Sequence, residues 1–219
     1  MSKIKVILFD LDGTIADTID ALHHGINLAM NALGYPENTR DDIRAHINYG
    51  ARQLVRLSLP AEIQNDEAKV DEALAVYSKK YSEVYTESNV PYDGIPEVFS
   101  TLQSRGYRLA VISNKPDAFV PVLAEILLPK NSYEIARGQR IGAPAKPDPT
   151  VPLELASLLG ATGAECALVG DSNVDMLTAK NAGMLAVGVT WGYRPAEILM
   201  EAGADTLANH PLDLLNIFD

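Results

Sequence analysis

The chain has 219 residues, with 29 acidic and 18 basic side chains and a formal net charge of −11 at neutral pH. This length suits one α/β core that carries an inserted subdomain. The negative charge repels a phosphate backbone, so we expect no nucleic-acid partner. The single cysteine, Cys166, excludes an internal disulfide framework and a thiolate metal site, and it favours a reducing, cytoplasmic location.

The first predicted element is a strand at residues 4–9, IKVILF, a nearly continuous apolar run that ends in acid and glycine. Such a run is typical of a buried central parallel strand. It is too short for a signal sequence or a membrane span, so we expect no association with a membrane.

A helical pattern follows from residue 17 to about residue 88, clearest where Val70, Leu74, Tyr77, Tyr81 and Val84 recur at three- and four-residue steps. No convincing strand interrupts it. We therefore predict an inserted all-helical domain at residues 16–89, between two parts of an α/β core at residues 1–15 and 90–219.

Helical and strand patterns alternate through the rest of the chain. The predicted helices are 98–106, 117–127, 150–160, 174–183, 195–203 and one after Pro211, and the predicted strands are 108–113, 133–136, 166–170 and 185–189. This alternation predicts a Rossmann-like, doubly wound parallel sheet that binds ligands at the carboxyl ends of its strands.

Three predicted strands end in polar sequences: DLDGT after the first, SNK after the second and GDSNVD after the fourth. Carboxyl ends of parallel strands meet at one edge of a sheet. The residues expected to converge there are Asp10, Asp12, Ser113, Asn114, Asp171 and Asp175. Four carboxylates in one crevice repel one another unless a cation neutralises them. Oxygen ligands without a Cys or His cluster favour Mg²⁺, which commonly binds a substrate phosphate oxygen as well.

Phosphoryl transfer needs a nucleophile, neutralising charge and a group that exchanges a proton with the leaving oxygen. Asp10 and Asp12, one residue apart at a strand end, can divide the roles of nucleophile and proton shuttle. Lys146, in the loop AKPDPT, can place a positive charge at the phosphoryl group. Ser113 and Asn114 can donate hydrogen bonds to it.

The motifs DLDGT, SNK, AKPDP and GDSNVD, in this order, resemble those of the haloacid dehalogenase-like hydrolases, and the resemblance covers nearly the whole chain. It implies a role for most polar residues of the site: Asp10 as nucleophile and metal ligand, Asp12 as general acid/base and metal ligand through its backbone carbonyl, Ser113 and Lys146 as phosphoryl binders, Asp171 as metal ligand and Asp175 as a support for the metal.

The aspartate two residues after the nucleophile, Asp12, resembles the residue found at that position in the phosphatase and mutase branches of this superfamily. The helical insertion resembles a cap that closes over the site and selects the substrate. The segments INYGARQLVRLSL, PYDGIPEVFSTLQSRGYRLAVISNKP and TWGYRPAEILMEAGAD look like the phosphoglycolate phosphatase branch. The resemblance thus implies Mg²⁺-dependent hydrolysis of a small phosphorylated metabolite, 2-phosphoglycolate, through an aspartyl-phosphate.

Several alternatives stay open at this stage. The function could be that of a phosphomutase of the β-phosphoglucomutase type, an inorganic pyrophosphatase or nucleotidase, or a non-catalytic binding module. Asn114 could cap the following helix, and Asp175 could serve a first helical turn. Arg52 in the insertion could reach a substrate carboxylate, although an arginine on a helix face is more often solvated. Without a heptad seam or an exposed apolar stripe, we expect a monomer or a homodimer.

Overall fold

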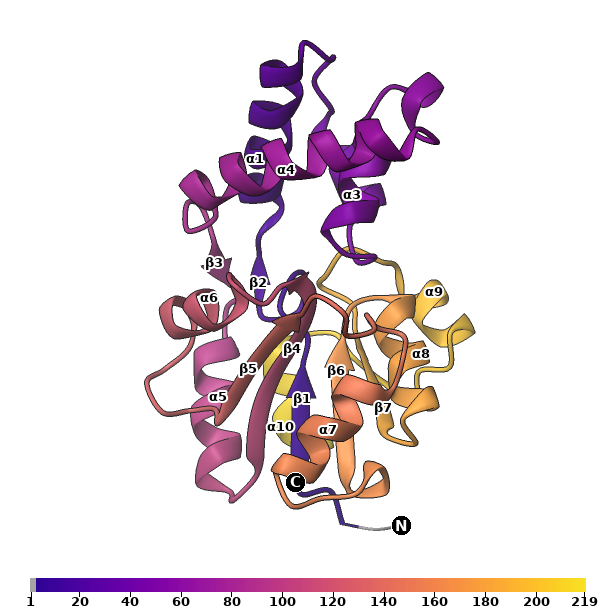
Figure 1. Ribbon diagram of the computed structural model, residues 1–219. Helices are drawn as coiled ribbons and strands as arrows, with labels where there is room; N and C mark the ends of the chain where they lie inside the picture. Colours follow the sequence, from indigo (N-terminus) through magenta and orange to yellow (C-terminus); the bar gives the residue numbers. More distant parts are fainter. Residues whose placement is uncertain (1–2) are drawn as a thin grey trace. The chain divides into compact units, whose positions relative to one another are not determined.

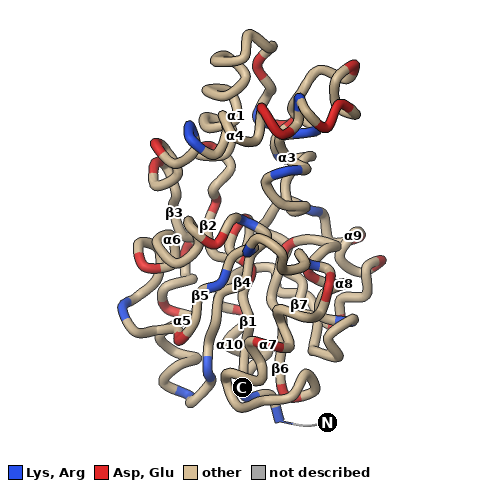
Figure 2. Tube along the Cα trace, viewed as in Figure 1, with Lys and Arg blue, Asp and Glu red and all other residues tan. Residues whose placement is uncertain are grey.

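The structure is a computed structural model that describes residues 3–219. It contains two compact units (Figure 1). One comprises the chain up to Asp17 together with Val90–Asp219, and the other is Thr18–Asn89. Acidic side chains are spread along both units (Figure 2). No helix among the described residues is long and apolar enough to cross a membrane.

The larger unit is built on a six-stranded sheet in the order β5-β4-β1-β6-β7-β8 (Figure 1), and every neighbouring pair is parallel. Its strands are β1 (Val6–Phe9), β4 (Arg108–Pro116), β5 (Ile135–Gln139), β6 (Cys166–Gly170), β7 (Leu185–Val189) and β8 (Thr206–Ala208). This arrangement confirms the predicted Rossmann-like α/β class.

The first strand, β1, lies in the middle of the sheet between β4 and β6. Leu8 is in register with Ala110 on one side and Leu168 on the other, and all four residues of β1 are buried. The order of strands reverses at β1, which is the point where open α/β sheets form a crevice beyond their carboxyl ends. The residues that follow β1 are therefore placed at the floor of a potential ligand site.

Helices and short 3₁₀ segments accompany the strands of this unit: α5 (Ile95–Ser104), α6 (Val120–Leu127), α7 (Thr150–Leu158), η2 (Gly163–Glu165), α8 (Asn173–Asn181), α9 (Ala196–Glu201), η3 (Pro211–Asp213) and α10 (Leu214–Ile217). Alternate residues of a strand point to opposite faces. Leu8 accordingly joins a buried cluster with Leu155 of α7 and Met176 of α8. Its neighbour Phe9 instead packs on Phe99 of α5, with ring centroids 4.6 Å apart. Helices thus cover both faces, as a continuous apolar strand requires.

The strands that the sequence analysis missed are all short. β2 (Ala16–Asp17) and β3 (Val90–Pro91) form a two-residue antiparallel pair, and β8 adds three residues to the edge of the main sheet. Runs of two or three residues are too short to show a period. The strand predicted at 133–136 begins at Ile135 and ends at Gln139, because its last three residues, Arg-Gly-Gln, carry no apolar pattern.

The smaller unit is helical throughout residues 18–89, with α1 (Ile19–Leu33), α2 (Arg40–His46), α3 (Ala51–Ser58), η1 (Ala61–Ile63) and α4 (Glu67–Val84). α1 packs closely on α4 at Gly25, where a Cβ atom would lie 2.6 Å from Tyr81 Cδ2. Tyr81 in turn stacks on Tyr77, with centroids 5.3 Å apart. Four of the five apolar residues that predicted α4 from their spacing are therefore on its buried face, and the fifth, Leu74, is partly buried.

Candidate active site

All buried charged side chains among residues 3–219 belong to the segments that follow β1 and β6, the end of β4 and the loop before α7. They are Asp10, Asp12, Lys115, Lys146, Asp171 and Asp175. Burying a charge is costly unless it is paired, so such a concentration is typical of a functional site. Four carboxylates and two ammonium groups leave an excess of two negative charges at this edge of the sheet.

Lys146 connects two of the carboxylates. Its Nζ donates hydrogen bonds to Asp10 Oδ1 at 2.8 Å and to Asp175 Oδ1 at 2.6 Å, and all three side chains are at most 6% exposed. Burial alone would lower the pKa of Lys146, but Asp10 and Asp175 raise it above its ordinary value. Lys146 is therefore a permanently charged ammonium next to Asp10.

Asp10, Asp171 and Asp175 each offer a carboxylate oxygen, and these oxygens lie within 4.8 Å of one another. Burial, followed by the charge of Asp175, raises the pKa of Asp10 well above its usual range and that of Asp171 to about 7. The one ammonium group of Lys146 cannot balance three close carboxylates. Oxygen donors with unbalanced negative charge fit a hard divalent cation such as Mg²⁺.

Asp171 is held by two other segments, through a main-chain N–H of one and a side-chain hydroxyl of the other. The Tyr193 N–H donates to Asp171 Oδ2 at 2.7 Å, and the Thr14 hydroxyl lies 3.4 Å from Oδ1. Gly13 is in the left-handed region at φ 85°, and a Cβ atom there would lie 2.4 Å from Asp171 Oδ2. The glycine of DLDGT is therefore required for the turn and for the close approach of this carboxylate.

Asp175 has a structural role and a role in the site. Its Oδ2 accepts hydrogen bonds from the Ser172 hydroxyl and N–H, which completes a capping box at the start of α8. Its other oxygen accepts from Lys146. The position of Asp175 in the first helical turn is therefore confirmed, and its support of a metal stays a prediction.

Asn114 and Ser113 lie in the last part of β4. Both ends of the Asn114 amide contact the main chain of Lys146: Nδ2 donates to its carbonyl at 3.0 Å, and Oδ1 accepts from its N–H at 2.8 Å. The Ser113 hydroxyl accepts a hydrogen bond from the Lys115 N–H at 3.1 Å and is buried. Asn114 thus fixes the loop that carries Lys146, and phosphate binding by either side chain stays a prediction.

Lys115 is the charged residue that the sequence analysis left without a role. Its Nζ donates to Asp12 Oδ1 at 2.7 Å, and the two side chains are 3% and 10% exposed. The sequence does contain a signal for this pairing. Lys115 comes two residues after the apolar run RLAVIS, and a lysine inside a buried strand requires an anionic partner.

Arg52 lies in α3 of the helical unit, where it donates hydrogen bonds to Glu67 at 2.6 Å and to Asp71. Its side chain is 44% exposed. These two carboxylates neutralise the charge of Arg52 within the helical unit. Its predicted contact with a substrate carboxylate stays untested.

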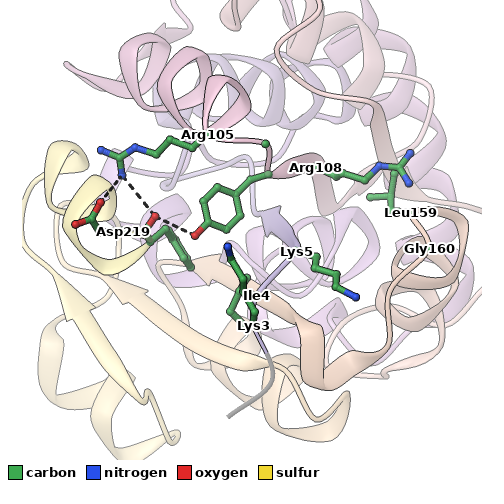
Figure 3. Close-up of a pocket in the computed structure, with 11 residues that line it drawn as sticks. Lys3, Ile4, Lys5, Arg105, Arg108, Leu159, Gly160 and Asp219 are labelled. Atoms are coloured by element: carbon green, nitrogen blue, oxygen red, sulfur yellow. Dashed lines mark hydrogen bonds and ion pairs between the residues drawn. The ribbon is translucent and has the colours of Figure 1, made fainter.

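A cavity of about 740 Å³ lies at the opposite edge of the sheet, beside the starts of β1 and β4 (Figure 3). Basic residues line it, but acidic groups balance much of their charge. Lys5 pairs with Glu165 and Arg108 with Glu134, while Arg105 donates to main-chain carbonyls near the C-terminus. The buried, unbalanced charge is at the other edge, and we take that edge as the candidate active site.

Known proteins resemble this chain over most of its length. A family model described as haloacid dehalogenase-like hydrolase matches residues 7–189. Phosphoglycolate phosphatase 1 from Pseudomonas aeruginosa is 31% identical over 219 residues, covering 98% of this chain and 80% of the relative. A phosphoglycolate phosphatase from Colwellia psychrerythraea is 32% identical over 208 residues, covering 93% of this chain and 92% of the relative. The crystal structure of a candidate phosphoglycolate phosphatase from Lactobacillus delbrueckii subsp. bulgaricus has a TM-score of 0.90 at 29% identity, covering 99% of this chain and 98% of that chain.

Proposed function

This chain belongs to the haloacid dehalogenase-like hydrolases and is a phosphoric monoester hydrolase, and from this premise we propose that it hydrolyses 2-phosphoglycolate through an aspartyl-phosphate formed on Asp10. The observation that carries the proposal is the environment of Asp10. Its carboxylate accepts a hydrogen bond from Lys146, lies within 4.8 Å of two further carboxylates, and precedes the buried Asp12 by two residues.

In the first step an Asp10 carboxylate oxygen attacks phosphorus, and the bond between phosphorus and the ester oxygen breaks. Asp12 gives a proton to that oxygen, so the leaving group departs as an alcohol. In the second step Asp12 takes a proton from water as the water oxygen attacks phosphorus. Inorganic phosphate is released, and the Asp10 carboxylate is restored. Lys146 stays charged throughout and reduces the repulsion between Asp10 and a phosphate dianion.

Asp10, Asp171 and the backbone carbonyl of Asp12 would hold Mg²⁺, with Asp175 close by. When bound, the cation neutralises negative charge on the phosphoryl oxygens. The two excess negative charges of the buried cluster and its oxygen-only donors support this choice of metal.

The substrate rests on the names of the relatives, several of which are phosphoglycolate phosphatases that align over most of their length. A mutase would share the first step, but it would return the phosphoryl group to a sugar instead of to water. The role of the helical unit as a substrate-selecting cap, with Arg52 as a contact, stays a prediction from the resemblance.

The test is release of inorganic phosphate from 2-phosphoglycolate, a sugar phosphate, a nucleoside monophosphate and pyrophosphate, each with Mg²⁺, using Asp10→Asn as the blank. Preferential release from 2-phosphoglycolate that disappears in the variant is the expected result. Asp10-dependent release from another compound would keep the mechanism and reject the substrate. Absence of release from all four would contradict the proposed hydrolase activity.

A further inference from the structure

The two buried lysines of the site contact different aspartates. Lys146 donates to Asp10 and Asp175, whereas Lys115 donates to Asp12 at 2.7 Å. Lys115 comes from the end of β4, and Lys146 comes from the loop before α7. Separate elements therefore supply one positive charge next to the nucleophile and a second next to the general acid.

The reaction assigns different parts of the substrate to these two aspartates. Asp10 meets the phosphorus atom, while Asp12 must come within about 2.6–3.2 Å of the ester oxygen to give it a proton. An ammonium group that donates to Asp12 is consequently near the leaving group. The positive charge of Lys115 therefore lies near the substituent that the substrate carries next to its ester oxygen.

The Lys115 side chain is almost fully buried beside Asp12. The exposed fractions of the side chains are 3% for Lys115, 10% for Asp12 and 6% for Asp10, so a substrate group that reaches Lys115 is shielded from water, which strengthens its attraction to the ammonium group. Lys115 donates to Asp12, and an ammonium group carries three N–H donors, so it can contact more than one oxygen atom.

We propose that Lys115 is the residue that binds the carboxylate of the leaving group and so selects phosphate esters of 2-hydroxy acids over esters of neutral alcohols. In such an ester the carboxylate is on the carbon next to the ester oxygen, which places it within reach of a cation that contacts Asp12. This inference rests on the proposed function, because it assumes that Asp12 protonates the ester oxygen. It adds a reason, within this chain, for a substrate of the phosphoglycolate type.

The test compares two esters of nearly equal size, 2-phosphoglycolate and 2-hydroxyethyl phosphate, in which a neutral hydroxymethyl group replaces the carboxylate. The measured quantity is the ratio of kcat/KM for the two esters. A lost hydrogen bond between charged groups predicts that this ratio falls about 10- to 100-fold in Lys115→Met, mainly through KM for 2-phosphoglycolate. Lys115→Arg, which keeps the charge, should retain part of the preference.

Lys146→Met is the matched control, because it removes the other buried ammonium. It should lower kcat/KM for both esters to a similar extent and leave their ratio nearly unchanged. Equal losses for both esters in Lys115→Met would overturn the proposal and reduce Lys115 to a residue that positions Asp12. A wild-type ratio near one would also overturn it, and this result does not require any variant to fold. Absence of phosphate release from both esters by the wild-type enzyme would instead reject the proposed function itself.

Discussion

The Asn114 side chain binds the main chain of Lys146 on both sides, accepting from its N–H at 2.8 Å and donating to its carbonyl at 3.0 Å. The two residues are 32 positions apart, so this contact ties the end of β4 to the loop before α7. The position of the Lys146 ammonium beside Asp10 therefore depends on an uncharged residue in a different segment.

Replacing Asn114 with Ala should leave two buried main-chain groups without partners. Each such group costs about 1–3 kcal/mol, so we expect a clear loss of unfolding free energy together with a fall in kcat. Denaturant unfolding and phosphate release measure the two effects. Asn31→Ala is the control, because Asn31 makes one exposed hydrogen bond, to Glu37. Wild-type kcat in Asn114→Ala would contradict a positioning role for this residue.

Asp10→Asn should abolish phosphate release and, without metal, raise the thermal midpoint of unfolding. Burial and the nearby Asp175 hold the pKa of Asp10 well above its usual range, so its charge opposes folding at neutral pH. Calorimetry in a chelator tests stability, and acid quenching with labelled substrate tests for the phosphoenzyme. Asp20→Asn removes an exposed carboxylate and should change neither quantity. A phosphoenzyme in Asp10→Asn would show that another residue is the nucleophile.

Asp171 should make the stability of the metal-free protein depend on pH. Burial raises its pKa to about 7 from the ordinary 3.8, so the folded state binds this proton more tightly than the unfolded state. Its contribution to stability is therefore complete below about pH 4 and is lost as the pH rises towards 7. The unfolding free energy of wild type minus that of Asp171→Asn, measured in a chelator, should fall by a few kcal/mol, to order of magnitude, across this range. A constant difference would contradict the raised pKa.

Removal of divalent metal should stop phosphate release and lower the thermal midpoint, and Mg²⁺ should restore both. At a Mg²⁺ concentration about 100 times its dissociation constant the stabilisation is about 2.7 kcal/mol. Asp171→Asn should lose most of this metal-dependent shift, whereas Asp205→Asn, outside the cluster, should retain it. Equal shifts in the two variants would place the metal elsewhere.

Gly13→Ala should cause a larger loss of activity than a glycine substitution of the same backbone conformation elsewhere. A Cβ atom at Gly13 would lie 2.4 Å from Asp171 Oδ2. Gly106 is the matched control: its φ is 89°, close to the 85° of Gly13, and nothing lies within 4 Å of its added Cβ. Both variants share the cost of a left-handed alanine, so the difference between them measures the crowding of Asp171. Similar phosphate release by both variants would contradict this account.

Elements with many buried apolar residues were predictable from the sequence. The strands at 166–170 and 185–189 occur where the apolar runs predict them, because each strand buries most of its side chains. β8 was missed, since three residues that pair only at the edge of the sheet leave no periodic pattern. A strand can therefore be recognised from its apolar pattern only when it has several buried residues.

For the polar residues of the site, the sequence predicts which residues come together but not which hydrogen bonds they form. The ends of parallel strands predict that Asp10, Asp171 and Asp175 converge, and the structure places them within 4.8 Å of one another. Individual partners were not predictable, because they depend on which way each side chain turns. The pairing of Lys115 with Asp12 and the attachment of Asn114 to Lys146 are such cases.

The ion pairs of the site join residues that are distant in the chain: 136 positions separate Lys146 from Asp10, and 103 separate Lys115 from Asp12. No short stretch of sequence contains all the buried charged groups of the site, and Asp175 is supplied only when four fifths of the chain have been made. During synthesis on the ribosome, the polypeptide would therefore stay catalytically silent until the sheet had closed around β1. A proteolytic fragment that began after Asp12 or ended before Asp175 would be silent for the same reason.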